Sequence, residues 1–217
     1  MQECQRCGTC CRKGPPALHD SDREIYLCGV LCKEHLITLR KGEYVYDNIQ
    51  DCIQQLDQDL IRIRPKESSK ACFFLNEANN DCEIYLHRPL ECRVMKCWDN
   101  QDIIDTYAHS RIERKDLIPE HSALYEIILE HESKCSVQAV EGLARRFKKE
   151  ENNEYLIELS QILDTDCYIR KFLQNKAGAG ASSLEFVLGR SLDKVLPNLG
   201  LKVEVGETGY KFQRVFS

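Results

Sequence analysis

Short runs of apolar residues, separated by turn residues, dominate the first part of the chain. Residues 60–64 alternate between apolar and charged positions and predict a strand that ends before Pro65. Ser21 and Glu24 have the spacing of a capping box and predict a helix that runs toward Leu31. Further short elements are expected as a hairpin of residues 36–40 and 44–46, strands at 72–75 and 82–85, and a helix that starts at Arg88-Pro89.

Long helical patterns follow after Trp98. Apolar residues recur at helical spacing over residues 122–132, 137–148 and 155–173. A second capping box, Ser182 and Glu185, predicts a further helix, and residues 201–205 and 210–216 predict a closing hairpin. The sequence therefore predicts an α+β fold with two domains. A cysteine-rich region spans residues 1–97, and a mainly helical region at 98–217 ends in a β-hairpin and is expected to offer a docking surface.

The composition is that of an ordinary globular chain, apart from its cysteines. The chain has 217 residues and a net charge of -5, and neither region is basic, so nucleic-acid binding is not expected. Neither a targeting segment nor an apolar run long enough for a membrane span is evident, which indicates a cytoplasmic protein. Of the thirteen cysteines, eleven precede residue 98. An odd number of cysteines in a reducing compartment argues against a disulfide framework, so we expect the thiols to bind metal or carry out chemistry.

Two groups of cysteines stand out by their spacing. The first is Cys4-x2-Cys7-Gly8-x-Cys10-Cys11, a glycine-containing turn on which thiolates can converge on a metal. Because consecutive side chains usually diverge, Cys10 and Cys11 are expected to serve two neighbouring sites or one polynuclear cluster. The second group, Cys72, Cys82, Cys92 and Cys97, lies at the edges of predicted elements. Together they supply the eight thiolates of two four-cysteine sites, and the alternative is that these thiols are buried in the core.

The same residues carry a resemblance to a known family. Cys4-x2-Cys7-x2-Cys10-Cys11, Cys72-Phe73-Phe74-Leu75, Cys82-Glu83-Ile84-Tyr85-x2-Arg88-Pro89-x2-Cys92-Arg93 and Cys97 resemble, over residues 4–97, the zinc- or iron-chelating CxxCxxCC family, also called YkgJ-type cysteine-cluster proteins. The resemblance implies metal chelation by Cys4, Cys7, Cys10, Cys11, Cys72, Cys82, Cys92 and Cys97. A related cysteine pattern occurs in flagellin lysine methylases, which are similar to iron–sulfur proteins that use S-adenosylmethionine.

The identity of the metal follows from the ligand type only in part. All-sulfur ligation suits zinc or iron–sulfur clusters and disfavours magnesium or calcium. The density of thiols and the adjacent pair favour one or two iron–sulfur clusters of the [4Fe–4S] type, with zinc as the alternative. Arg88 and Arg93 are the expected cofactor-binding residues, because their charge would offset that of a thiolate centre.

The expected function is electron transfer, or a role as subunit of a redox complex with a protein partner, since saturated thiolate ligation leaves no position open for substrate. One alternative is a structural zinc module in protein–protein interaction. A second, implied by the resemblance, is an S-adenosylmethionine-dependent methyltransferase-like enzyme. No catalytic residue is predicted.

Four other cysteines are left open as ligands. Cys28 and Cys32 share a face of the predicted helix and could form an additional site with Cys52, although their apolar neighbours favour core positions. Cys135 lies four residues after His131, a pair more typical of surface or core than of a metal site.

Overall fold

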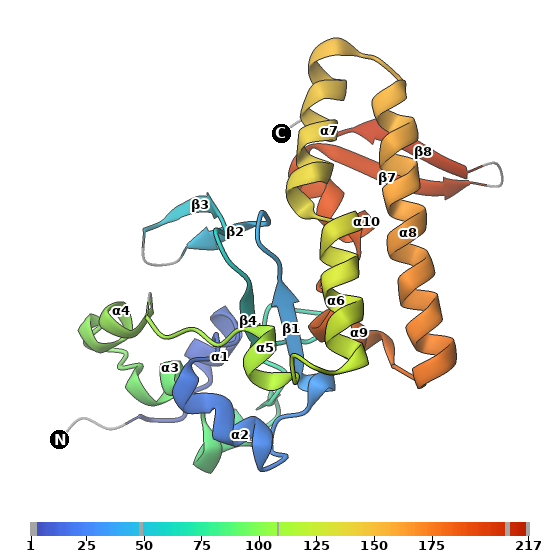
Figure 1. The fold of residues 1–217 in the computed structure, drawn as a ribbon. Helices are drawn as coiled ribbons and strands as arrows, with labels where there is room; N and C mark the ends of the chain where they lie inside the picture. The colour runs from blue at the N-terminus through green and yellow to red at the C-terminus, as the bar shows by residue number, and fades with distance from the viewer. Residues whose placement is uncertain (1–3, 48–49, 108, 207–208, 216–217) are drawn as a thin grey trace.

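The computed structural model describes residues 4–47, 50–107, 109–206 and 209–215 and has a mixed α+β fold, as predicted (Figure 1). The front of the chain forms short elements: α1 (Thr9–Lys13), α2 (Arg23–Leu27), β1 (Leu36–Leu39), β2 (Tyr44–Asp47), β3 (Cys52–Gln55), β4 (Leu60–Ile63), β5 (Leu75–Asn76), β6 (Asp81–Cys82), α3 (Leu90–Val94), α4 (Gln101–Tyr107) and α5 (Arg114–Leu117). The remaining elements are α6 (Ala123–Lys134), α7 (Val137–Glu150), α8 (Glu154–Ala177), α9 (Ala181–Val187), α10 (Leu192–Val195), β7 (Leu201–Gly206) and β8 (Gly209–Arg214). Within the described ranges, no helix has the length and apolar character needed to cross a membrane.

The helical part follows the sequence pattern closely. Ser122 caps α6 by accepting a hydrogen bond from the backbone N–H of Tyr125 at 3.2 Å. Helices α7 and α8 pack along each other, and the closing hairpin of β7 and β8 lies against them at the end of the molecule opposite α1 and α3 (Figure 1). Residues 207, 208 and 216 of the predicted hairpin lie outside the described residues.

The predicted hairpin between residues 36–40 and 44–46 is wrong. The turn itself forms, because the Glu43 N–H donates to the Arg40 carbonyl at 3.0 Å. However, β1 pairs with β4, and β2 pairs with β3. All four residues of β1 and three of the four in β4 are buried, whereas β2 and β3 are mainly exposed or half-buried. Burial therefore determines the pairing: the two buried strands, β1 and β4, pair with each other, and the two more exposed strands, β2 and β3, pair with each other.

Both predicted capping boxes differ from the helix starts in the structure. A 3₁₀ turn over Asp20–Asp22 precedes α2, and Asp22 rather than Ser21 accepts a backbone hydrogen bond there, from His19. Helix α2 also ends earlier than predicted, because Gly29 adopts a φ of 80° that turns the chain. In α9 the N-cap is Gly180, so Ser182 lies inside the helix.

The main apolar core draws on both parts of the chain. Leu36 and Ile63 from the front strands are buried in the same cluster as Ile112, Ile128 and Phe186. A second cluster lies among α7, α8, α10 and β7. Because the first cluster includes residues on both sides of Cys97, this contact joins the cysteine-rich part to the helices. A domain boundary at residue 97 stays a prediction.

A buried carboxylate joins three helices in the helical part. Asp166 of α8 accepts hydrogen bonds from His131 Nε2 of α6 at 2.7 Å, from Arg170 Nε at 2.9 Å and from the backbone N–H of Leu192 at 3.2 Å. The other ring nitrogen of His131, Nδ1, is buried without a hydrogen-bond partner among the described residues. A proton on Nδ1 would therefore be a buried, unsatisfied donor, so the site holds neutral histidine.

We expect this arrangement to make the fold sensitive to mild acid. Burial lowers the pKa of His131, with contributions from Arg40 and Arg170, and this outweighs the opposing effect of Asp166. Below the ordinary histidine pKa of about 6.5 the unfolded chain takes up a proton that the folded chain refuses, so stability falls as the pH decreases. Urea unfolding between pH 7 and pH 5 measures this loss. The variant His131→Gln should show a shallower pH dependence, and an equal slope in both proteins would contradict the assignment.

Candidate metal centre

The first cysteine group lies on a loop and on the short helix α1. Gly8 starts α1 with a φ of 72°, and an added Cβ there would lie 2.8 Å from Nη1 of Arg12, so the turn requires glycine. Nη1 of Arg12 also donates to the Cys7 carbonyl at 3.0 Å. Cys10 and Cys11 follow on α1, where consecutive residues point about 100° apart. Their thiols therefore face different neighbours.

Cys10 faces a cysteine that is distant in sequence. Its sulfur lies 3.9 Å from that of Cys97, in the turn between α3 and α4. Burial raises the pKa of the Cys10 thiol to about 11, and the nearby Cys97, Cys11 and Cys7 thiols add to this shift. Cys7, Cys10 and Cys97 are all exposed. We call these three residues the outer group.

Cys11 faces the remaining cysteines of the motif. Burial raises the pKa of Cys92 well above its usual value, and repulsion from the Cys72, Cys11 and Cys82 thiolates adds to the effect. Burial likewise raises the pKa of Cys72 to about 12, with Cys11 and Cys82 as its charged neighbours. We call Cys11, Cys72, Cys82 and Cys92 the inner group. Cys4 acts on the pKa of Cys11 and lines a cavity with Cys92, so it lies near the inner group.

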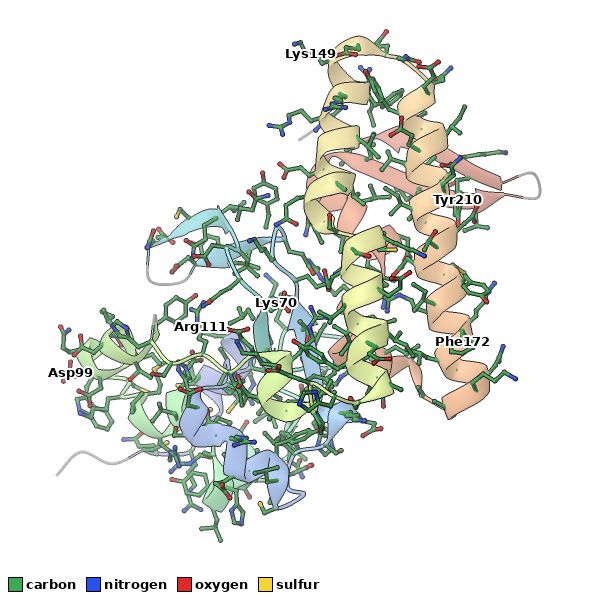
Figure 2. All side chains as sticks on the ribbon, viewed as in Figure 1. Lys70, Asp99, Arg111, Lys149, Phe172 and Tyr210 are labelled. Carbon is green, nitrogen blue, oxygen red and sulfur yellow. The ribbon has the colours of Figure 1, made fainter. Side chains whose placement is uncertain are left out.

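Backbone contacts bring the inner group together from three segments. The Cys72 N–H donates to the Cys11 carbonyl at 2.8 Å, which joins α1 to the strand region. Leu75 of β5 pairs with Cys82 of β6, and the Leu75 N–H donates to the Cys72 carbonyl at 3.1 Å. Figure 2 shows most of the sulfur atoms gathered at this end of the molecule, around α1 and α3.

Helix α3, which carries Cys92, is held in place by the residues just before it. The Leu90 N–H donates to Asp22 Oδ1 at 2.8 Å. The Glu91 carboxylate accepts from the Ala17 N–H at 2.9 Å and lies 3.2 Å from His19 Nε2. These contacts tie α3 to the chain that follows α1. The sequence alone did not predict this role of Glu91. Its position next to Cys92, a predicted ligand, was the only signal for it in the local sequence.

Several cysteines already have groups nearby that favour the thiolate. The Thr9 side chain and then its backbone lower the pKa of Cys7, and the backbone at Phe74 and Ile84 opposes the burial that raises the pKa of Cys72 and Cys82. For Cys82 the Arg88 guanidinium acts in the same direction, against the dominant effect of burial. Arg93 instead lies 3.5 Å from Asp22.

The side chains fit a thiolate metal site in kind and in number. The inner group supplies four sulfurs, and the outer group together with Cys4 supplies four more. In the described parts of the chain, no three His, Cys, Asp or Glu side chains are arranged so that they could hold one ion. Binding would therefore have to draw the sulfurs of each group inward.

The cysteines outside the motif have other surroundings. Cys28 is exposed and Cys32 is half-buried, so the predicted core position of Cys28 is wrong. The sulfur of Cys32 lies 3.3 Å from Nδ1 of His35, a pair that the sequence analysis missed. Cys52 is exposed on β3, whereas Cys135 is fully buried and its thiol donates to the Ile162 carbonyl at 3.7 Å. A ligand role for these four stays an open prediction.

Comparison with known proteins agrees with this picture. The family model CxxCxxCC, described as "Putative zinc- or iron-chelating domain", matches residues 3–113, which is 111 of the 217 residues. The match includes all eight cysteines of the inner and outer groups with Cys4. No curated protein and no solved structure matches the chain.

Proposed function

The chain belongs to the CxxCxxCC family of zinc- or iron-chelating domains, and on this basis we propose that its motif cysteines form two metal centres of four thiolates each. The inner centre takes Cys11, Cys72, Cys82 and Cys92, and the outer centre takes Cys7, Cys10 and Cys97. Cys4 lies near the inner group but is assigned to the outer centre as its fourth ligand, because the inner centre is already complete with four thiolates. The observation that carries the proposal is the divergence of Cys10 and Cys11, because Cys10 lies against Cys97 whereas Cys11 neighbours Cys82 and Cys92.

We propose electron transfer as the function of these centres. Four thiolates fill a tetrahedral coordination shell and leave no position for substrate, which disfavours Lewis-acid chemistry. Iron bound there, as a single ion or as an iron–sulfur cluster of the [4Fe–4S] type, supplies one-electron redox chemistry. The exposed thiols of the outer group put that centre within reach of a partner. The two centres adjoin each other through consecutive residues of α1.

The proposed setting is a reducing compartment with a protein partner. All thirteen cysteines are free, and their number is odd. Glutathione and thioredoxin keep such thiols reduced in the cytoplasm, where metal can compete for them. We propose that residues 98–217 provide the docking surface for the redox partner.

One distance favours a single ion over a cluster at the outer centre, and a structural zinc module is the second candidate that uses a single ion. Two thiolates bound tetrahedrally at about 2.3 Å from zinc lie about 3.8 Å apart. The sulfurs of Cys10 and Cys97 are 3.9 Å apart, which suits a shared single ion. Cysteines on different irons of a cluster lie further apart, because iron and sulfide separate them. This candidate makes the outer group a clamp that holds the turn after α3 against α1.

Metal and acid-labile sulfide analysis of anaerobically purified protein, with visible and EPR spectra, distinguishes the candidates. Electron transfer requires stoichiometric iron and a reversible change in the spectrum on reduction. Sulfide in proportion to iron indicates clusters, and iron without sulfide indicates single-ion centres. Colourless protein with stoichiometric zinc would exclude electron transfer and support the structural module.

A further inference from the structure

A surface cavity of about 450 Å³ lies beside the inner group. Cys4 and Cys92 contribute to its wall, which also contains four cationic side chains, Arg6, Arg88, Arg93 and Lys96. No Asp or Glu lines it among the residues that the structure describes. Its volume falls within the range of about 300 to 1,000 Å³ that is usual for small-molecule sites. The cavity is therefore large enough for a small ligand and is strongly positive.

Two of the four cations are already paired. Arg93 lies 3.5 Å from Asp22, and Lys96 forms an ion pair with Asp102. Arg6 and Arg88 have no acidic partner in the described portion of the chain. Two guanidinium groups without a carboxylate partner in the described ranges thus remain in the cavity wall, of which Arg88 also acts on the Cys82 thiol.

One aromatic ring holds these two guanidinium groups. The guanidinium carbon of Arg6 lies 3.9 Å from the centre of the Tyr85 ring, and that of Arg88 lies 3.7 Å from it. Arg88 also donates from Nε to the Tyr85 carbonyl at 2.9 Å. Among the described residues its two terminal nitrogens have no hydrogen-bond partner, and they form a fork, the geometry that binds phosphate and carboxylate oxygens in pairs.

The rest of the wall is apolar. Met95 is half-buried, and the Trp98 side chain is 46% exposed. A large exposed indole beside a cationic fork provides a surface for an aromatic or aliphatic group. The wall therefore combines a binding site for two negative charges with a surface for an organic body.

We propose that this cavity binds a small phosphate monoester with an aromatic body, whose dianion binds the terminal nitrogens of Arg88 while Arg6, on the same Tyr85 ring, adds a second positive charge and the body packs on Met95 and Trp98. The inference rests on the proposed function only in that two motif cysteines adjoin the site. It adds a binding site for a small anionic ligand at the edge of the metal centre, besides the proposed docking surface for a protein partner. Phosphate monoesters carry nearly two charges above pH 7, which matches the two unpaired guanidinium groups.

Calorimetric titration of the full-length, metal-loaded protein at pH 8 tests the proposal with three probes. Phenyl phosphate is the dianionic ester, phenyl sulfate has the same ring with one charge, and inorganic phosphate lacks the ring. We expect phenyl phosphate to bind at least tenfold more tightly than either of the others. Arg6→Gln and Arg88→Gln should each weaken its binding at least tenfold, and Trp98→Ala should remove its advantage over inorganic phosphate.

Arg111→Gln is a matched control. Arg111 stacks on Tyr107 at 4.6 Å and donates from Nε to the Tyr107 carbonyl at 3.0 Å, the same arrangement as Arg88 on Tyr85 but outside the cavity. Its loss should leave binding unchanged. Metal content is measured for every variant. If Arg88→Gln loses metal, the Arg6→Gln variant, which replaces an exposed residue, tests the proposal instead.

Three results would overturn the proposal. One is absence of phenyl phosphate binding at millimolar concentration in metal-loaded protein, and another is unchanged binding in both arginine variants. The third is tighter binding of a penta-glutamate peptide than of phenyl phosphate, which would assign the cavity to an acidic protein partner. If the wild-type protein contains no metal, the proposed function is refuted and not the ligand site. Metal analysis of the same sample distinguishes this outcome from the three above.

Discussion

Replacement of Cys11 by serine is expected to empty the inner centre and leave the outer centre loaded, whereas Cys10→Ser should do the reverse. The two residues are adjacent on α1, but their thiols face different groups, so each substitution removes one ligand from one centre only. Metal per chain should fall to about half in each variant. Elemental analysis after desalting measures the loss.

The two substitutions should differ more in stability than in metal content. The inner group connects α1, the β5–β6 hairpin and α3, whereas the outer group lies at the surface. Binding of a structural metal by thiolates contributes about 10 kcal/mol or more in small metal-dependent domains. We therefore expect Cys11→Ser to lower the melting temperature much more than Cys10→Ser does, with residues 4–97 still folded enough to hold the outer centre.

Cys52→Ser is the matched control for both variants, because Cys52 is an exposed cysteine of the same part of the chain and lies outside the motif. It should retain all the metal. Equal and complete metal loss in Cys10→Ser and Cys11→Ser would indicate one shared centre and would contradict the division into two.

The second large effect is expected at the buried carboxylate of the helical part. Asp166→Asn should lower the free energy of unfolding by about 3 kcal/mol, the order observed when one partner of a buried ion pair is removed. Although burial alone would raise the pKa of Asp166, the hydrogen bonds from His131 and Arg170 lower it far below its usual range. The substitution therefore leaves the partly buried charge of Arg170 with no anion opposite it. Urea unfolding at pH 7 measures the loss.

Asp164→Asn provides the control on the same helix. Asp164 is exposed and accepts one hydrogen bond, from the Tyr210 hydroxyl at 2.9 Å, which asparagine can still accept. Its substitution should change stability by less than about 0.5 kcal/mol. A similarly small effect of Asp166→Asn would show that the three contacts of Asp166 do not stabilise the fold.

Local patterns in the sequence predicted the elements that are stabilised by contacts between residues close in sequence. The period of apolar residues located α6, α7 and α8, because a helix satisfies its own backbone and buries one face whatever its partner is. The predicted hairpin of β1 and β2 failed for the opposite reason. Leu36 finds its partner Ile63 across 27 residues, and only the burial of both strands selects that pairing over the nearer one.

The sequence by itself determined which cysteines are the predicted ligands, since the order and spacing of the eight motif cysteines are readable along the chain. The proposed division into two groups rests on the tertiary structure. Cys10 meets Cys97 across 87 residues, and a single helical step turns Cys11 toward another group. The stacking of Arg6 and Arg88 on Tyr85 likewise depends on where the N-terminal loop lies. Such contacts join distant segments, and their geometry depends on the packing of every element between them.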